Sequence, residues 1–272
     1  MEKTHPPDKM GGQDSDWDMV LGDGPVIATA IHDGHHLRDS LLPYVAIDDA
    51  ERRREEDPLT GLLAAVGDAR ITARTSRFQV DLNRPRDKAM SSDPADTWGL
   101  QVWRDLPDAE RERSLAEHDR FYSMISDLIE ERLARWGCVL LIDIHSYNHR
   151  RDGADAAPAP QQANPDIELG VTTLDPKRWG GVARTFGQVL RDTPVGGRNP
   201  DVRENVRFPT GGYFPEWVYA TWGERVCTIS PEFKKIYMDE WTGLADIAVL
   251  EDVRRGVRAA VEAVRPEVLS CR

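Results

Sequence analysis

No stretch of this sequence approaches the roughly 18 consecutive apolar residues that a membrane-spanning helix requires. Its N-terminal segment, MEKTHPPDKMGGQDSD, lacks the apolar core of a secretory signal peptide. Basic charge is scarce: 35 basic residues against 47 acidic ones give a net charge of -12, which repels nucleic-acid phosphates and anionic membrane surfaces. We therefore expect a soluble, cytoplasmic protein that binds neither nucleic acid nor a membrane.

Cysteine is also scarce. The chain has three, Cys138, Cys227 and Cys271, which is an odd number with no spacing typical of a metal site. Cys138 and Cys227 lie in apolar runs, so we expect both in the core, whereas Cys271 lies in the C-terminal tail. This pattern predicts that the cysteines are reduced and that no disulfide stabilises the fold.

The composition along the chain predicts one domain behind a short arm. Residues 1–16 are polar and rich in proline and glycine, so we expect a mobile arm there and a single domain over residues 17–272. Residues 152–166, rich in proline and alanine, predict a long surface loop. No internal repeat divides the rest of the sequence.

Apolar periodicity predicts that strands and helices alternate. Buried strands are predicted at residues 25–31, 138–144 and 225–230. Amphipathic helices are predicted at residues 107–137, 176–192 and 242–264. Asp108 is the expected N-cap of the first helix and Gly137 its C-cap. This alternation favours an α/β fold, a mixed and mostly parallel sheet with helices on both faces.

Reactive side chains follow three of the predicted strands. His32 follows the first, Asp143 and His145 close the second, and Glu232 comes two residues after the third. Open α/β sheets bind ligands outside the carboxyl ends of their strands. We therefore interpret these side chains as parts of one site.

A catalytic zinc site would suit such a group. Two histidines and one carboxylate, with one coordination position open, form zinc sites that polarise carbonyls and activate water. His32 and His145 are the candidate histidine ligands, with Asp143 able to orient one of them. The third ligand would come from a set of nearby acids and histidines: Glu55, Glu56, Asp57, His35 and His36.

Simpler interpretations stay open for the same residues. The histidines can be hydrogen-bonded core residues, and the charged run ERRREED can be a solvated helix face. Ser146 and His149 would make a nucleophile pair, but no nucleophile elbow surrounds the serine.

A second polar cluster, TARTSRFQVDLNRPRD, gathers arginines in an otherwise acidic protein: Arg74, Arg77, Arg84 and Arg86. If residues 76–83 alternate as in a strand, one face carries Arg77, Gln79, Asp81 and Asn83. Guanidinium groups bind carboxylates through paired hydrogen bonds, so the cluster favours an acidic small molecule. Surface salt bridges are the alternative.

Six motifs occur along the chain in this order: HDG, EDPLTG, SRFQVDLNRPRD, DIHSY, GGYF and PEFKKIYMDE. Together they resemble the N-formylglutamate amidohydrolase family, zinc-dependent hydrolases related in fold to the zinc carboxypeptidases, which have a phosphorylase/hydrolase-like sheet. The resemblance extends over about residues 25–245 and makes residues 17–272 a catalytic domain.

The resemblance implies roles for single residues. One zinc ion per chain would bind His32, His145 and an acid, which aligns best as Asp57 and next best as Glu56. Glu232 would act as general base and then general acid. Substrate contacts would come from a second set: Arg77, Asn83, Arg84, Arg86, Gly211 and Gly212.

The implied reaction is hydrolysis of the amide of an N-acyl amino acid, with N-formyl-L-glutamate giving formate and glutamate. The small acidic substrate would be the main partner. Hydrolysis of another N-acyl amino acid or of a small peptide is the closest alternative. A metal-containing binding protein of the same fold, without turnover, and a metal-free protein are the others.

Overall fold

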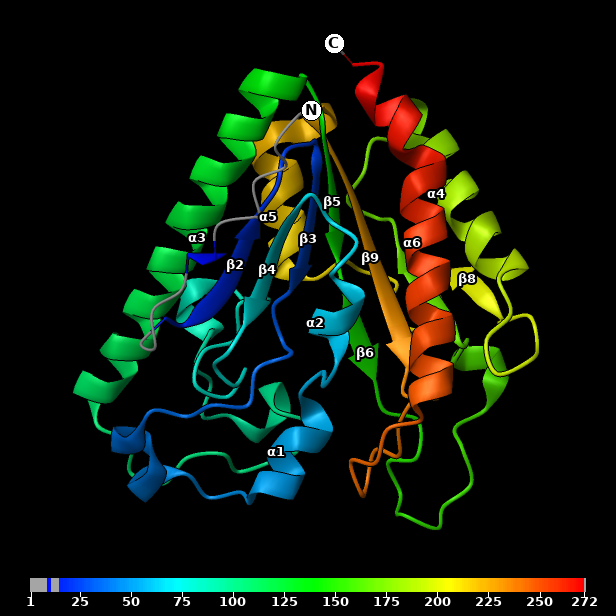
Figure 1. Cartoon of the computed structure of the whole chain (residues 1–272). Helices are drawn as coiled ribbons and strands as arrows, with labels where there is room; N and C mark the ends of the chain where they lie inside the picture. The colour runs from blue at the N-terminus through cyan, green and yellow to red at the C-terminus, as the bar shows by residue number, and fades with distance from the viewer. Residues whose placement is uncertain (1–8, 11–14, 272) are drawn as a thin grey trace.

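The computed structural model describes residues 9–10 and 15–271, so most of the predicted mobile arm lies outside the described residues (Figure 1). A nine-stranded sheet has the order β1-β2-β4-β3-β5-β9-β7-β8, with β6 paired to β9. The strands are β1 (Lys9–Met10), β2 (Trp17–Leu21), β3 (Val26–Ala30), β4 (Ala69–Ala73), β5 (Val139–Asp143), β6 (His145–Tyr147), β7 (Ile167–Gly170), β8 (Val202–Glu204) and β9 (Val226–Lys234).

The centre of the sheet is parallel. Strands β4, β3, β5 and β9 run in one direction, and β6 is parallel to β9. Antiparallel pairs join β1 to β2, β2 to β4, and β7 to β9. The sheet is therefore mixed, as predicted. Because β3, β5 and β9 are parallel neighbours, their carboxyl ends meet at one edge, where the candidate site residues lie.

Helices cover both faces of the sheet (Figure 1). The α-helices of the described residues are α1 (Asp49–Glu55), α2 (Thr60–Leu63), α3 (Asp108–Trp136), α4 (Pro176–Asp192), α5 (Tyr213–Trp222) and α6 (Ile247–Leu269), and α1 lies beyond the carboxyl ends of the strands (Figure 1). Ile27 of β3 packs on one face in a cluster with Phe121 of α3. Ala28 points to the other face and packs in a cluster with Phe186 of α4. Full burial of each phenylalanine contributes about 1.5–3 kcal/mol.

Some predicted boundaries need correction. Helix α3 has Pro107, not Asp108, as its N-cap, whereas Gly137 is the C-cap as predicted. Helix α6 begins at Ile247 rather than at residue 242, because the Asp246 side chain accepts a hydrogen bond from the Val249 amide and caps the helix there. Strand β9 extends beyond the predicted residues 225–230 and carries Glu232 within it.

No strand forms over residues 76–83, where alternation predicted one. The Ser76 carbonyl accepts from the amides of Gln79 and Val80, so the chain turns. The Asp81 side chain then accepts from the Asn83 amide at 2.9 Å. A separate apolar cluster, which contains Phe78 of the turn and Leu41, supports this turn outside the main sheet.

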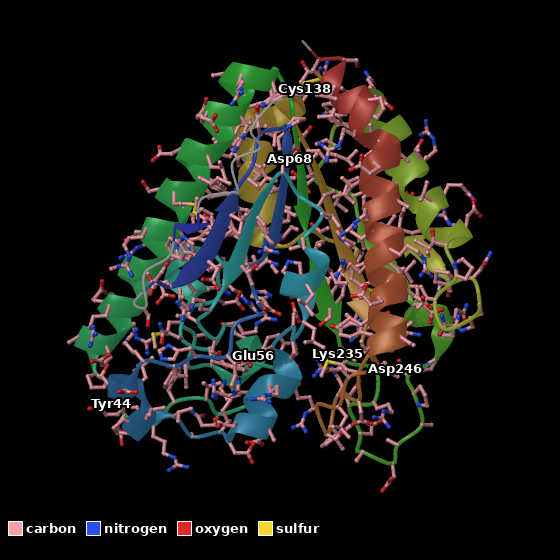
Figure 2. The ribbon with its side chains drawn as sticks, viewed as in Figure 1. Tyr44, Glu56, Asp68, Cys138, Lys235 and Asp246 are labelled. Carbon is pink, nitrogen blue, oxygen red and sulfur yellow. A yellow bond between two sulfur atoms is a disulfide. The ribbon has the colours of Figure 1, made fainter. Side chains whose placement is uncertain are left out.

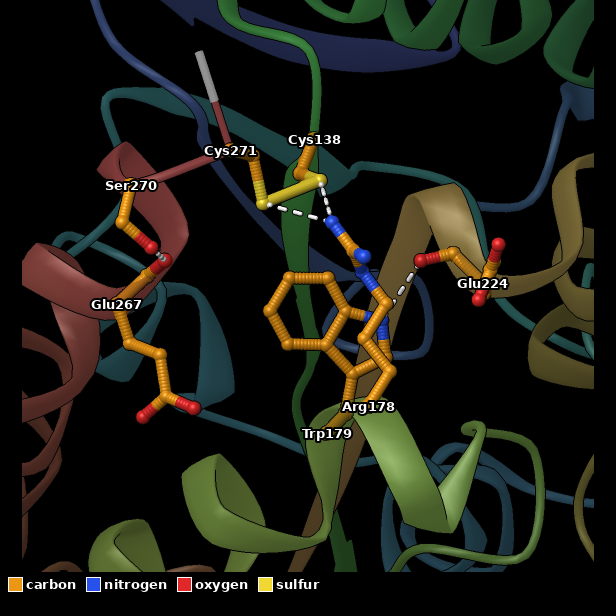
Figure 3. The surroundings of a disulfide bond; sticks show 7 residues. All are labelled: Cys138, Arg178, Trp179, Glu224, Glu267, Ser270 and Cys271. Atoms are coloured by element: carbon orange, nitrogen blue, oxygen red, sulfur yellow. Dashed lines mark hydrogen bonds between the residues drawn. A yellow bond between two sulfur atoms is a disulfide. The ribbon is translucent and has the colours of Figure 1, made fainter.

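The prediction of reduced cysteines is wrong for two of the three. Cys138 and Cys271 form a disulfide, with their Cα atoms 5.7 Å apart (Figure 3). The Arg178 guanidinium of α4 lies beside both sulfur atoms, at 3.1 and 3.2 Å. The end of α6 meets the start of β5 only in the folded chain, so local sequence carried no signal of this pairing. Cys227 is free and buried, as expected.

Among the helices that the structure describes, none is both long enough and apolar enough to cross a bilayer.

Candidate active site

Three buried side chains meet at the carboxyl edge of the sheet. His32 follows β3, Asp57 lies in the turn after α1, and His145 begins β6. Their candidate ligand atoms all lie within 4.8 Å of one another. The Asp57 amide also donates to the His32 carbonyl at 2.9 Å, which fixes the two loops together. The predicted clustering of strand-end residues is therefore what the structure shows.

Carboxylates orient both imidazole rings. His32 Nε2 lies 2.8 Å from Asp81 Oδ1, and His145 Nε2 lies 2.8 Å from Asp143 Oδ2. The Nδ1 atoms face Asp57 Oδ2 instead, at 3.4 Å from His32 and 3.1 Å from His145. Proteins use such carboxylate partners to orient metal-binding histidines.

His32 Nδ1 is the clearest sign of a ligand site. It is buried, and the described residues offer it no hydrogen-bond partner, because the Asp57 oxygen at 3.4 Å lacks hydrogen-bond geometry. A buried polar atom without a partner costs about 1–3 kcal/mol. Two imidazole nitrogens and one carboxylate oxygen in this arrangement fit a metal ion such as zinc.

The electrostatics of the cluster favour a cation. Burial would raise the pKa of Asp57, but interactions with His145 and His32 outweigh it and hold the pKa well below its usual range. Burial would lower the pKa of His145, yet the Asp143 and Glu232 carboxylates raise it well above its ordinary value. Positive charge, carried by a proton or by a metal ion, is therefore stabilised between these side chains.

Glu232 stands beside the cluster. It is opposite His145 in the register of β6 and β9. Burial, with a further contribution from Asp57, raises the pKa of Glu232 to about 8, although His145 opposes the shift. A carboxyl group that titrates near neutral pH can both take and return a proton, as general acid–base catalysis requires.

The cluster opens into a cavity of about 480 Å³. Predicted site residues line it: His32, Asp57, Arg77, Asn83, His145, Gly211, Gly212 and Glu232. Others that line it were not predicted to bind substrate: Glu55, Trp98, Ser146, Tyr147, Asn148, Arg151, Arg207, Phe208, Pro209, Thr210 and Lys235.

Of the three candidate acids, Asp57 points into the cluster, whereas Glu55 and Glu56 have partners elsewhere. Glu56 turns away from the cluster, accepts from Ser76 and pairs with His35 Nδ1 at 2.5 Å. Glu55 instead accepts two hydrogen bonds from Arg151, at 3.0 and 2.8 Å. Neither His35 nor His36 belongs to the metal-type cluster found among the described residues.

Two predicted substrate residues lie in the cavity wall with partners of their own. Arg77 Nη2 lies 2.8 Å from Asp81 Oδ2, and the guanidinium stacks on Trp98. Asn83 Oδ1 accepts from the Phe214 amide at the start of α5. A Cβ added to Gly212 would lie 2.3 Å from Asn83 Nδ2, so a side chain at this position would displace the Asn83 amide.

Arg84 and Arg86 do not reach the cavity, contrary to the prediction. Arg84 Nη2 donates to the Asp96 carbonyl at 2.8 Å. Arg86 Nε donates to Asp119 at 2.8 Å on the outer surface, where 47% of its side chain is exposed. The turn over residues 76–83 replaces the expected strand and directs both side chains away.

Lys235 is a buried residue of the site that the sequence did not indicate. Its Nζ donates to the carbonyls of Arg54 at 2.6 Å and Glu56 at 2.8 Å, and to Asn148 Oδ1 at 2.8 Å. Glu56 and Lys235 lie side by side below the sheet (Figure 2). Lys235 therefore fixes the segment that ends in Asp57 onto the chain that follows β9.

Comparison with known proteins identifies the family of the chain. The sequence model of the N-formylglutamate amidohydrolase family matches residues 24–238 of this chain. The chain belongs to the N-formylglutamate amidohydrolase family. Family membership confirms the resemblance seen in the six motifs and supports an amidohydrolase activity. No curated protein matches the chain significantly.

Solved structures share the fold. An N-formylglutamate amidohydrolase from Ralstonia eutropha JMP134 is 20% identical, with a TM-score of 0.72, over 92% of this chain and 98% of that chain. A gene product of Agrobacterium tumefaciens is 18% identical, with a TM-score of 0.59, over 89% of this chain and 92% of that chain. A metallo-carboxypeptidase from Burkholderia cenocepacia is 14% identical, with a TM-score of 0.36, over 90% of this chain and 60% of that chain. The first two matches confirm the predicted mixed α/β sheet with flanking helices.

Proposed function

We propose that this family member is a zinc-dependent amidohydrolase that cleaves the amide of an N-acyl amino acid. N-formyl-L-glutamate, giving formate and glutamate, is the substrate we favour. The observation that carries the proposal is the unpartnered, buried Nδ1 of His32, next to a carboxylate-oriented His145 and the high-pKa carboxyl of Glu232. Residues 17–272 would form the catalytic domain, and the cytoplasmic location stays a prediction.

One zinc ion per chain would bind His32 Nδ1, His145 Nδ1 and an Asp57 oxygen. These atoms lie within 4.8 Å of one another, and two carboxylates hold the opposite ring nitrogens. When bound, zinc supplies a Lewis acid that polarises an amide carbonyl and makes water more acidic.

Glu232 would move the proton. It takes a proton from the water that attacks the amide carbonyl carbon, and a new C–O bond forms. It then returns that proton to the leaving nitrogen as the C–N bond breaks. Burial raises the pKa of Glu232 to about 8 in the metal-free site, and a cation bound beside it would lower that pKa and help the carboxylate take the proton.

The walls of the cavity would hold the substrate. Arg77, fixed by Asp81 and Trp98, presents a guanidinium edge to the oxyanion that develops on the carbonyl or to the α-carboxylate. Asn83 contributes an amide beside the backbone of Gly211 and Gly212. A site lined by these groups favours a small acidic molecule.

Turnover of a substrate panel tests the proposal. Purified protein is assayed for metal content and then with N-formyl, N-acetyl and N-succinyl forms of several amino acids. We expect about one zinc per chain and the highest kcat/KM with N-formyl-L-glutamate. Bound metal without turnover of any panel member would favour a binding protein of the same fold. No metal, even after zinc is supplied, would contradict the proposed mechanism.

A further inference from the structure

Arg207 lines the cavity with its positive charge uncompensated. Its Nη1 donates to Asn164 Oδ1, a neutral acceptor. Its Nε is buried, and no hydrogen-bond partner for it occurs in the described part of the chain. Nor does any carboxylate of residues 15–271 form an ion pair with this guanidinium. A buried donor of this kind leaves a hydrogen bond that a group entering the cavity can complete.

The other cations of the cavity already have several partners within the protein. Arg77 pairs with Asp81 at 2.8 Å, and Arg151 pairs with Glu55 at 2.8 Å. The Lys235 ammonium group has three protons and donates to three oxygen atoms. Arg207 is therefore the cavity cation best able to take up an anion from outside.

The Arg207 side chain is also preorganised for binding. Its guanidinium carbon lies over the Tyr147 ring, 4.7 Å from the centroid, and 5.4 Å from that of Phe208. The amides of Arg207 and Phe208 both donate to the fully buried Glu168, at 2.6 and 2.7 Å. Glu168 thus anchors the backbone of this segment through its two amides and not through the Arg207 guanidinium. A stacked, preorganised arginine loses little freedom when it binds a planar carboxylate.

The position of Arg207 fits one end of a substrate. His145 and Tyr147 are two residues apart on β6, so their side chains project from the same face, about 6.5 Å apart along the strand. An amide held at His145 can therefore send an acidic side chain toward the guanidinium on Tyr147. Arg77 and Asn83 are left for the α-carboxylate.

We propose that Arg207 is a specificity-determining residue that binds the side-chain carboxylate of an acidic N-acyl amino acid. This inference rests on the proposed function for its substrate class. It adds a residue that neither the arginine cluster nor the strand-end residues indicated.

Kinetics on two matched substrates test the proposal. In Arg207→Gln, KM for N-formyl-L-glutamate should rise about 10- to 100-fold while kcat changes little, because a charge-assisted contact is lost. KM for N-formyl-L-glutamine should stay close to that of the unmodified enzyme. Arg207→Lys should lose part of the discrimination, since it keeps charge but not the paired donors. Equal losses on both substrates, or no loss on either, would overturn the proposal.

A binding measurement separates this proposal from the hydrolase function. Calorimetry on the metal-loaded protein compares N-acetyl-L-glutamate with N-acetyl-L-glutamine, whether or not either is hydrolysed. The unmodified protein should bind the glutamate compound more tightly, and Arg207→Gln should remove that preference. Arg255→Gln, which removes an exposed arginine paired with Asp252 on α6, is the matched control and should keep it. Equal binding of the two compounds by the unmodified protein, or no binding, would contradict the role of Arg207.

Discussion

Lys235 Nζ lies 2.8 Å from the carbonyl oxygen of Glu56, one residue before the candidate metal ligand Asp57. The same ammonium group reaches Arg54 and Asn148, and only 1% of Lys235 is exposed. Two loops that are distant in sequence are thereby joined behind the cavity.

Lys235→Met should lower both stability and metal affinity. The change leaves the buried carbonyls of Arg54 and Glu56 without their donor, at a cost of about 2–4 kcal/mol in the free energy of unfolding. Urea unfolding and zinc titration measure the two effects. Lys177→Met, at an exposed position on α4, is the control. Unchanged zinc affinity would mean that Asp57 is positioned without Lys235.

Glu232→Gln should abolish turnover while metal stays bound. The amide keeps the shape of the carboxyl group but cannot take a proton, so kcat should fall about 10²- to 10⁴-fold. Metal analysis of the same sample separates catalysis from ligation. Glu224→Gln, at an exposed position, should keep full activity. Loss of metal together with activity would make Glu232 a ligand instead of a base.

The carboxylates behind the histidines should control metal affinity. Asp143 accepts from Thr29 Oγ1 at 2.7 Å and orients His145 Nε2. Asp143→Asn should weaken zinc binding about 10- to 100-fold, whereas His145→Ala should remove the metal. Competition with a chromogenic chelator measures both. Equal zinc affinity in Asp143→Asn and the unmodified protein would contradict this role.

Asp166 should make stability depend on pH in the acid range. Burial would raise the pKa of Asp166, but hydrogen bonds from Arg198 and the Asp201 amide, with the charge of Lys234, hold it below its usual value. As pH falls, Asp166 is therefore protonated at a higher pH in the unfolded chain than in the folded protein. The stability that Asp166 contributes is complete above its ordinary pKa of about 3.9 and is lost at lower pH.

Asp166→Asn tests this dependence. At pH 7 the variant should be less stable by about 2 kcal/mol, a value reduced from that of a fully buried pair because Arg198 is largely exposed. Below about pH 4 the difference should begin to shrink, but most of it should remain at pH 3, because the pKa of Asp166 in the folded protein lies below that pH. Urea unfolding at pH 7, 5 and 3 measures the difference, and a constant difference across that range would contradict the prediction.

Local patterns in the sequence predicted the central architecture. Strand β3 is a continuous buried run, helix α3 carries apolar residues at helical spacing, and Gly137 ends α3 as its position suggested. His32 and His145 were found because each follows a buried strand. These features depend on neighbouring residues, which a sequence displays directly.

Features that depend on distant contacts could not be predicted in this way. The alternation over residues 76–83 is typical of a strand. In the structure, however, the Ser76 carbonyl accepts from the Gln79 and Val80 amides, and the Asp81 carboxylate accepts from the Asn83 amide. Arg86 consequently faces solvent. The choice of Asp57 over Glu56 depends on how the end of α1 turns, and Arg207 enters the cavity through its anchorage to Glu168.

The Cys138–Cys271 disulfide has a consequence for how the parts of the candidate site are connected through the chain. Once formed, it closes a covalent ring from β5 to the end of α6, which contains His145 and Glu232. His32 and Asp57 lie outside that ring. A metal ion bound by His32, Asp57 and His145 would therefore link the segment before Cys138 to the segment that the disulfide closes into a ring.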